Sequence, residues 1–406
     1  MSVAPNHDLG SVLVVDGGPP DPTASAGLRS RLDLLNGLIT LGFDVALHTT
    51  DPPAPSHQHL YDALAELGVF EFSSGGREAL VDVVRAGSYA TLIAHGPAWG
   101  MLSLAALNQD PELARVYWGH DIQQRRRAAQ ARVEGQDHAH GIKALQLIEE
   151  RCWREFDATV YPTLREANIV SDKVGAAKGV ASPYYWLAES DITDLSTEPG
   201  PRQPRNQRRL LMVGGAAHPP NKDCVEWTVS ELAPMLVQDQ PDLVITVVGD
   251  WPRGDIQRLR SAHVEFTGQI SEGQLRELHS DSLCLLAPLR FGSGSRRKIV
   301  GAMGLGLPVV TTPEGQQGAL VRDGRGLQDG LLIAENPAGL AAAVQSLRED
   351  PTLARKCAHS AQRAAAEAYS ESAYTNGVAR ALMHASRQRD YRVAESVATS
   401  HQTVAT

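Results

Sequence analysis

A glycine- and serine-rich loop followed by three cations is the stretch of this chain that most clearly suggests chemistry. Residues 290–304 read RFGSGSRRKIVGAMG, and Arg296, Arg297 and Lys298 occupy the first turn of an expected helix. The positive end of a helix dipole repels cations, so this arrangement is unfavourable unless an anion binds there. Glycine lets backbone amides approach an anion closely, and a helix N-terminus provides unpaired N–H donors. The stretch therefore predicts a phosphate site.

Four small residues would supply the backbone amides of this site: Gly292, Ser293, Gly294 and Ser295. Arg296 and Lys298 would neutralise the bound charge. Neighbouring helical positions point in different directions, so one of Arg296 and Arg297 is expected to be structural or to face solvent, and Arg297 is the less certain ligand. The alternative interpretation is a flexible loop that carries a solvated basic patch.

A second candidate segment, GGAAHPPNK (214–222), follows an expected strand. Gly214 and Gly215 form a tight turn there, and we expect them to pass close to the same ligand. His218 and Lys222 either reach the ligand or its reaction partner, or they belong to a capped and solvated loop.

The bulk composition excludes several classes of protein. The chain has 406 residues, which favours two domains, and 42% apolar with 21% charged residues is typical of a globular protein. The net charge of −9 argues against general nucleic-acid binding. Four widely spaced cysteines predict reduced thiols and no disulfide framework or zinc site. Since no signal peptide or membrane span is recognisable, we expect a cytoplasmic protein, with peripheral contact at the inner membrane face left open.

The apolar runs predict two successive strand–helix series. Strands of the first series are expected at 11–17, 43–50, 89–96, 114–121 and 156–163. Strands of the second are expected at 209–215, 243–250, 264–268, 282–288 and 307–313. Helices are expected between them, for example at 27–42, 140–155, 224–238 and 337–350. The predicted fold class is α/β, with two Rossmann-like lobes whose parallel sheets face each other across a cleft.

Three segments resemble those of a known family. Residues 288–318, PLRFGSGSRRKIVGAMGLGLPVVTTPEGQQG, look like the donor-site signature of retaining GT-B glycosyltransferases of the family 4 type. Residues 214–227 resemble the segment that opens the second lobe of these enzymes. Residues 117–127, YWGHDIQQRRR, resemble the end of a first-lobe strand near the acceptor. The resemblance extends over residues 11–385 and is weaker in the first lobe.

The resemblance implies a hexosyltransferase that takes a sugar from a nucleotide sugar, a UDP- or GDP-sugar, and needs no metal or other cofactor. The cations beside the glycine-rich loop would then stabilise the leaving diphosphate. Glu314 and Gly315 would lie at the sugar end of the donor, where Glu314 either hydrogen-bonds sugar hydroxyls or remains a solvated turn residue. Gly27 would approach the distal phosphate.

One position departs from the family pattern. Many members carry two glutamates where this chain has Ser293 and Gly301, and the second glutamate typically holds the ribose hydroxyls of the nucleotide. Gly301 has no side chain with which to do so. Either another carboxylate serves the ribose, or water fills the gap and weakens donor binding, or the protein is no longer an efficient transferase.

Three residues of the first lobe are candidates for the acceptor side. His120 follows an expected strand and would point into the cleft, where the resemblance places a histidine near the reacting sugar. It would hydrogen-bond a hydroxyl, position the acceptor or, with a pKa near neutrality, act as a base, unless it only caps the next helix. His95 and Trp99, a ring suited to sugar stacking, are weaker candidates because both are more often core or loop residues.

We predict five parts of the chain: an acceptor-side lobe (1–189), a linker (190–208), a donor lobe (209–370), a helix that packs back on the first lobe (371–388) and a flexible tail (389–406). The expected reaction is metal-independent front-face transfer with retention, to an acceptor that is a saccharide, a lipid, a protein or a small molecule. The alternative function is a GT-B-like binding or scaffold protein with weak or no turnover. A nicotinamide dehydrogenase is disfavoured because DGGPPDP (16–22) does not fit the GxGxxG pattern.

Overall fold

The computed structural model describes residues 10–22, 26–175, 177–187, 207–319 and 330–404. They form two compact units. Unit 1 comprises Met1–Gln124, Ala139–Trp186 and Glu371–Thr406, and unit 2 comprises Arg125–His138 and Leu187–Ser370. Nearly all of the predicted linker at 190–208 lies outside the described residues.

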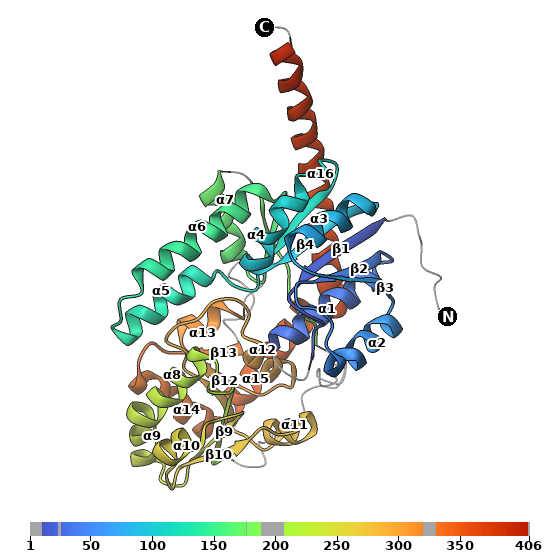
Figure 1. Ribbon diagram of the computed structural model, residues 1–406. Coiled ribbons are helices and arrows are strands. Elements are labelled where there is room, and N and C mark those ends of the chain that lie inside the picture. The colour runs from blue at the N-terminus through green and yellow to red at the C-terminus, as the bar shows by residue number, and fades with distance from the viewer. Residues whose placement is uncertain (1–9, 23–25, 176, 188–206, 320–329, 405–406) are drawn as a thin grey trace. The chain divides into compact units, whose positions relative to one another are not determined.

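Unit 1 is built on a seven-stranded sheet in the order β3-β2-β1-β4-β5-β6-β7, in which all neighbouring strands are parallel (Figure 1). Its strands are β1 (Ser11–Asp16), β2 (Asp44–Thr49), β3 (Val69–Ser74), β4 (Tyr89–His95), β5 (Ala114–Trp118), β6 (Ala158–Tyr161) and β7 (Gly179–Ala181). The central strands read as apolar runs because a parallel sheet is covered on both faces. The strand order reverses between β1 and β4, which is where ligands bind in such sheets.

Helical segments connect these strands: α1 (Ala26–Thr40), η2 (Pro55–His57), α2 (Gln58–Leu67), α3 (Arg77–Ala86), α4 (Gly96–Leu107), α5 (Gln123–Glu134), α6 (Ala139–Glu155) and α7 (Leu164–Val174). Most of α5 groups with unit 2, although its first two residues belong to unit 1. Those two residues, Gln123 and Gln124, donate their backbone amides to the carboxylate of Glu149, at 2.8 and 3.0 Å. This buried carboxylate satisfies amides that the first turn of a helix leaves unpaired.

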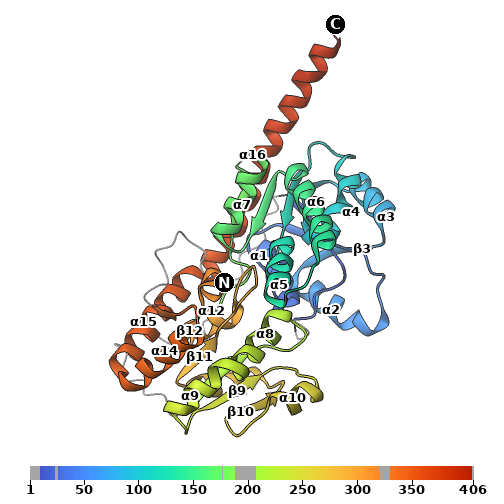
Figure 2. The ribbon, with the colours of Figure 1, turned by 90° about the vertical axis from the view of Figure 1, so that its left-hand side faces the viewer.

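The last helix, α16 (Glu371–Val404), belongs to unit 1, where it packs against α1, β5 and β6. Tyr374, Val378, Ala381 and Ala385 recur at helical spacing and are fully buried. Figures 1 and 2 show the C-terminal turns of α16 extending away from the sheet. The predicted end of this helix at residue 388 was wrong. The helix continues because residues 378–404 contain neither glycine nor proline.

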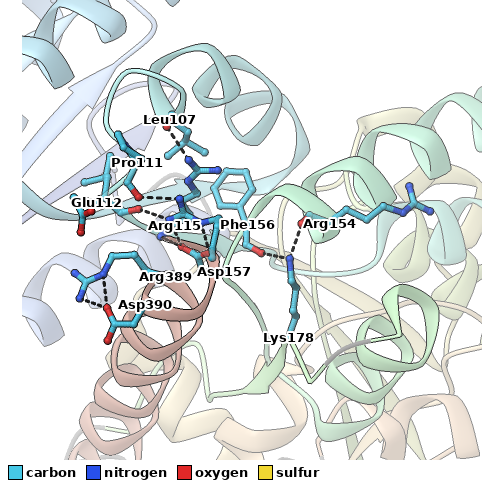
Figure 3. A network of polar contacts seen from close by, with 12 residues as sticks. Leu107, Pro111, Glu112, Arg115, Arg154, Phe156, Asp157, Lys178, Arg389 and Asp390 are labelled. Carbon is cyan, nitrogen blue, oxygen red and sulfur yellow. Dashed lines mark hydrogen bonds and ion pairs between the residues drawn. The ribbon is translucent and has the colours of Figure 1, made fainter. Parts of the chain in front are cut away.

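A network of polar contacts fastens α16 to the sheet. Figure 3 shows its centre, around Arg115 and Asp157. The buried Asp157 carboxylate accepts hydrogen bonds from the Arg115 backbone amide at 3.0 Å and from Arg392 of α16 at 2.9 Å. Arg392 also donates to the carbonyls of Pro111 and Leu113. One arginine therefore satisfies a buried charge and two backbone acceptors at once.

Unit 2 contains a six-stranded parallel sheet in the order β10-β9-β8-β11-β12-β13. Its strands are β8 (Arg209–Val213), β9 (Val244–Val248), β10 (Val264–Gly268), β11 (Cys284–Ala287), β12 (Val309–Thr311) and β13 (Leu331–Ile333). Its helices are α8 (Pro219–Trp227), the π-helical turn η4 (Thr228–Leu232), α9 (Ala233–Asp239), α10 (Arg253–Leu259), α11 (Glu272–Ser280), α12 (Arg297–Gly304), α13 (Pro313–Gln317), α14 (Pro337–Glu349) and α15 (Pro351–Ala368). The strand order reverses between β8 and β11.

The predicted class of two Rossmann-like units is confirmed. All four cysteines are unpaired and buried, as expected. No helix in the described parts of the chain is long and apolar enough to cross a membrane. The sequence did not reveal β3, β7 or β13, which are short or lie at sheet edges. Helix α8 begins at Pro219, five residues before the predicted start at residue 224, because proline suits the first helical turn.

We expect the Asp157–Arg392 contact to contribute to the stability of unit 1. Replacing Arg392→Ala leaves buried acceptors without their donor, so we expect the free energy of unfolding to fall by about 1–3 kcal/mol. Thermal unfolding followed by circular dichroism measures the loss. Arg389→Ala is the matched control on the same helix, because within the described ranges Arg389 contacts its neighbours Asp390 and Ser386. Equal melting temperatures for the two variants would contradict the fastening role.

Candidate functional site

The candidate residues of unit 2 gather at its topological switch point. The loop after β8 carries Gly214 and Gly215, and the loop after β11 leads into α12 with its three cations. β8 and β11 are neighbours in the sheet, so both loops leave the same edge at adjacent positions. This placement fits the rule that ligands of open α/β sheets bind where the strand order reverses.

Arg296 is largely buried and holds the glycine-rich loop together. Its Nη1 atom donates to the carbonyl of Ser293 at 2.6 Å and to that of Gly294 at 3.3 Å. Its Nη2 atom pairs with Glu314 at 3.3 Å. Since only 8% of its side chain is exposed, Arg296 lies behind the loop, where it fixes the loop conformation and adds positive charge.

The structure gives a reason for the glycines of this loop that the sequence did not reveal. Gly292 has a φ of +154°, and a Cβ atom built there would lie 2.5 Å from Nη2 of Arg296. A Cβ atom at Gly318 would lie 2.3 Å from Cγ of the same arginine. Both glycines therefore make room for the buried guanidinium. Gly294 has a φ of +71°, a left-handed conformation that suits glycine.

Lys298 is part-buried in the first turn of α12. Its Nζ atom donates a short hydrogen bond to Oδ1 of Asn221 in α8. Burial lowers the pKa of Lys298 to about 8, and the nearby positive charge of Arg296 adds to this effect. The two cations therefore lie close enough to repel each other, and an anion placed beside them would relieve that repulsion.

The Gly-Gly turn is shaped by its neighbours. A Cβ atom at Gly214, whose φ is +141°, would lie 2.4 Å from Nδ2 of Asn221. Nδ2 of Asn221 donates to the carbonyl of Gly215 at 3.1 Å. On the other side, Nε1 of Trp251 donates to the carbonyl of Gly214 at 3.0 Å. The turn is therefore held between α8 and the loop after β9.

The other predicted residues of unit 2 occupy varied positions. Glu314 pairs with Arg296, and a Cβ atom at the buried Gly315 would lie 2.0 Å from Oγ1 of Thr311, so packing alone requires that glycine. Lys222 pairs with Asp255 at 3.5 Å. His218 is exposed at the N-cap of α8. The part-buried Ser293 and Ser295 belong to the glycine-rich loop, and Arg297 is the first residue of α12. At Gly301, a Cβ atom would meet nothing within 4 Å.

A second polar group lies at the switch point of unit 1. Asp16 ends β1 and His95 ends the neighbouring β4, and their Oδ2 and Nδ1 atoms are 2.9 Å apart. Arg31 in α1 donates to the other carboxylate oxygen at 2.5 Å. Burial raises the pKa of Asp16, but His95, Arg31 and the Gly17 amide outweigh this and hold the pKa below its ordinary value. Asp16 is therefore a buried carboxylate that orients two partners.

His120 lies next to this group, on the loop between β5 and α5. Its ring stacks on that of His95 with centroids 5.5 Å apart and meets Tyr184 edge to face at 5.0 Å. Burial lowers the pKa of His120 to about 3, and His95 and Arg31 contribute. Burial disfavours the imidazolium, which argues against the alternative in which His120 acts as a base with a pKa near neutrality. The neutral ring is therefore the favoured form of His120.

Trp99 and Gly27 differ in their surroundings. Nε1 of Trp99 donates to Thr50 at 3.2 Å, and the Arg31 guanidinium lies 4.9 Å from the ring centroid. A Cβ atom at Gly17 would lie 2.7 Å from the same ring, so Trp99 is held within unit 1. Gly27 is exposed in the first turn of α1, about one turn before Arg31.

The sequence did not identify four structural residues: Asp16 and Arg31 in the unit 1 group, Asn221 in the unit 2 group, and Glu149 at the start of α5. Only Asp16 gave a usable signal, a charged residue directly after the apolar run VLVV. The other three lie on helices, where the sequence does not show which side chain turns toward a loop. Within the described parts of the chain, no group of three or more His, Cys, Asp or Glu side chains could hold a metal ion.

Comparisons with known proteins match part of the chain to a protein family. Residues 207–350, within unit 2, match the Glycosyl transferases group 1 family. A 150-residue stretch is 23% identical to an uncharacterised 44.6 kDa protein in the cps region of Klebsiella pneumoniae, and the match spans 34% of this chain and 39% of that protein.

Solved structures of low sequence identity share the fold. HepE of Anabaena in complex with UDP has a TM-score of 0.65 and 17% identity over 92% of this chain and 99% of that one. Sucrose-phosphate synthase of Thermosynechococcus elongatus has a TM-score of 0.66 and 16% identity over 91% and 98% of the two chains. The pneumococcal O-GlcNAc transferase GtfA, with UDP and GlcNAc, has a TM-score of 0.64 and 12% identity over 93% and 99%. The GT-B fold that the sequence predicted is confirmed, and residues 207–350 match a glycosyltransferase domain.

The lowered pKa of Lys298 predicts a pH dependence of nucleotide binding. Lys298 is charged below pH 8 and loses its proton as the pH rises through about 8. Bound phosphate favours the ammonium, so we expect the affinity for UDP to fall by about tenfold between pH 7 and pH 9.5. Isothermal titration calorimetry measures this change. Lys298→Arg keeps its charge over the range and should bind UDP equally at both values. A parallel fall in both proteins would contradict the assignment.

The pKa of His120 predicts a ring that does not titrate near neutrality. Because the value lies at about 3, the ring nitrogens should keep neutral-imidazole chemical shifts from pH 5 to pH 8. Nitrogen-15 NMR of the histidine side chains, assigned with His120→Asn, tests this directly. A midpoint above pH 5 would show that the imidazolium is solvated or paired, contrary to the packing.

Proposed function

We propose that the protein transfers a sugar from a nucleotide sugar to an acceptor hydroxyl with retention of anomeric configuration. The bond between C1 and the distal phosphate oxygen breaks, and the acceptor oxygen bonds to C1 on the same face. The acceptor proton passes to the departing phosphate oxygen, so the products are the glycoside and a nucleoside diphosphate. No protein nucleophile and no metal ion take part, and stabilisation of the leaving group provides most of the rate enhancement.

The observation that carries this proposal is the cation pair at the switch point of unit 2. Lys298 has a pKa lowered to about 8 by burial and by Arg296, at the first turn of a helix whose dipole is also positive. Glu314 pairs with Arg296, whereas Lys298 hydrogen-bonds the neutral amide of Asn221, so the charge of Lys298 remains available to an anion. In the proposed complex Lys298 meets the distal phosphate, and Arg296 adds its charge from behind the glycine-rich loop.

The proposed donor is a UDP- or GDP-sugar. The complexes of HepE and GtfA with UDP support the uridine nucleotide by analogy of fold. In the proposed site Gly292, Ser293, Gly294 and Ser295 present the loop to the diphosphate. Glu314 and Gly315 lie at the sugar end, and Gly214 and Gly215 border the donor.

The proposed acceptor side is the switch point of unit 1. His120, held neutral, would position a hydroxyl by hydrogen bonding, and Gly27 would approach the distal phosphate. We also propose that residues 1–189 form the acceptor lobe and residues 209–370 the donor lobe. The protein would act in the cytoplasm. The basic helix α5 offers a surface for peripheral contact with anionic lipids, because Arg125, Arg127 and Arg132 are exposed.

A second candidate, a binding protein with weak or no turnover, rests on Gly301. Because residue 301 is a glycine, this position supplies no carboxylate to hold a ribose, and a Cβ atom built there would meet nothing within 4 Å. Since there is room for a longer side chain, Gly301→Glu tests whether another group already occupies the ribose position.

Binding and turnover separate the two candidates. UDP-, GDP- and dTDP-sugars are incubated with the purified protein and a panel of acceptors, and product anomers are assigned by proton NMR coupling constants. Transfer with retention that Lys298→Ala reduces at least about 100-fold, the loss of a charge-assisted contact, supports the transferase. Binding without transfer or hydrolysis supports the binding protein, and inversion excludes the proposed mechanism. Tighter donor binding by Gly301→Glu would show that the ribose position is vacant, and weaker binding that it is filled.

A further inference from the structure

Asn221 connects the two loops of the unit 2 switch point. It lies in the first turn of α8 and was not expected to take part in the site. Its Oδ1 atom accepts the hydrogen bond of Lys298, and its Nδ2 atom donates to the carbonyl of Gly215 at 3.1 Å. One side-chain amide therefore joins the cation of α12 to the turn after β8.

The backbone of the neighbouring Gly214 packs closely against the Asn221 side chain. Any side chain at Gly214 would clash with the Asn221 amide, which a Cβ atom would approach to 2.4 Å. Behind Gly214, a Cβ atom at Gly249 would lie 2.7 Å from the Gly214 carbonyl carbon. The amide thus has little freedom to move, and an interaction with a rigid partner restricts the flexible lysine side chain.

The chemistry of an amide suits this position. Burial disfavours the charged form of Lys298, whereas a hydrogen bond to the neutral carbonyl oxygen of Asn221 favours it. A carboxylate in the same place would stabilise the ammonium more strongly, but it would also neutralise the charge that is needed for phosphate and repel the phosphate itself. A neutral acceptor holds the ammonium and leaves its charge available.

We propose that Asn221 is a positioning residue that holds the Lys298 ammonium charged and aimed at the switch point, beside the Gly214–Gly215 turn. The proposal rests on the proposed function for its role in donor binding. The effect of Asn221 on the Lys298 ammonium is a property of the free protein, and it can be tested without any donor.

The first experiment measures the ionisation of Lys298 in the absence of nucleotide. The rate of Lys298 acetylation by acetic anhydride is followed against pH by mass spectrometry of the peptide. Asn221→Leu removes the acceptor and should lower the midpoint from about 8 by roughly one pH unit, and Asn221→Asp should raise it by at least as much. Glu226→Gln on the same helix is the control and should not move it. An unchanged midpoint in both Asn221 variants would overturn the proposal.

A second measurement uses the unsubstituted protein, so that it does not depend on the folding of the Asn221 variants. The side-chain amide signal of Asn221 in a proton–nitrogen-15 spectrum should titrate with the same midpoint as Lys298. This titration should be absent in Lys298→Met. An Asn221 signal that ignores the titration of Lys298 would also overturn the proposal.

Donor kinetics then connect Asn221 to the proposed function. Asn221→Asp should raise the KM for the nucleotide sugar by about tenfold with a smaller effect on kcat, because a carboxylate beside Lys298 repels the donor. A change in the Lys298 midpoint without any nucleotide-sugar binding in the unsubstituted protein would refute the proposed function and retain the positioning role. A changed midpoint with unaltered KM would refute the role in donor binding.

Discussion

The candidate site of unit 2 depends on one constraint, the burial of the Arg296 guanidinium behind a glycine-rich loop. Burying a cation is costly unless it is paired and hydrogen-bonded, and here two loop carbonyls and the Glu314 carboxylate contact the Nη atoms of Arg296. The same contacts fix the loop, exclude side chains at Gly292 and Gly318, and place a positive charge beside Lys298. The site is therefore shaped by an arginine that makes most of its contacts with the protein itself.

The two units have polar groups at corresponding places in their sheets, but the side chains differ in chemistry. In each, the strand order of a parallel sheet reverses and leaves two loops at adjacent strand ends. Unit 2 lines this place with a lysine, an amide and glycine turns, which suits an anion. Unit 1 lines it with Asp16, its partners His95 and Arg31, and the neutral ring of His120. The proposed assignment of a donor side and an acceptor side rests on this difference.

The sequence predicted the fold class and most of the strands because parallel strands are continuous apolar runs. It missed the strands Val69–Ser74, Gly179–Ala181 and Leu331–Ile333, where length and edge position weaken that signal. Within the site, the cations and glycines were recognisable by type and spacing. The reason for Gly292 was not, because the side chain that fills its space comes from four residues later and turns back on the loop.

The sequence could not show the roles of Asn221 and His120, because both depend on residues that are distant in the chain. A hydrogen bond such as that from Lys298 to Asn221 joins residues 77 positions apart. The pairing of β8 with β11 brings the first turns of α8 and α12 together. The pKa of His120 likewise depends first on burial and then on His95 and Arg31, which come from other elements. Residue types indicate which chemistry is available, and packing decides which protonation state and which partner each group has.

The central claim is that the cation pair at the start of α12 binds the diphosphate of a nucleotide. A crystal structure of the full chain with UDP tests it most directly. The account predicts the distal phosphate within about 3 Å of Lys298 Nζ and against the loop of residues 292–295, with Arg296 still bonded to the loop carbonyls. A phosphate bound elsewhere, with Lys298 making no contact to it, would contradict the account.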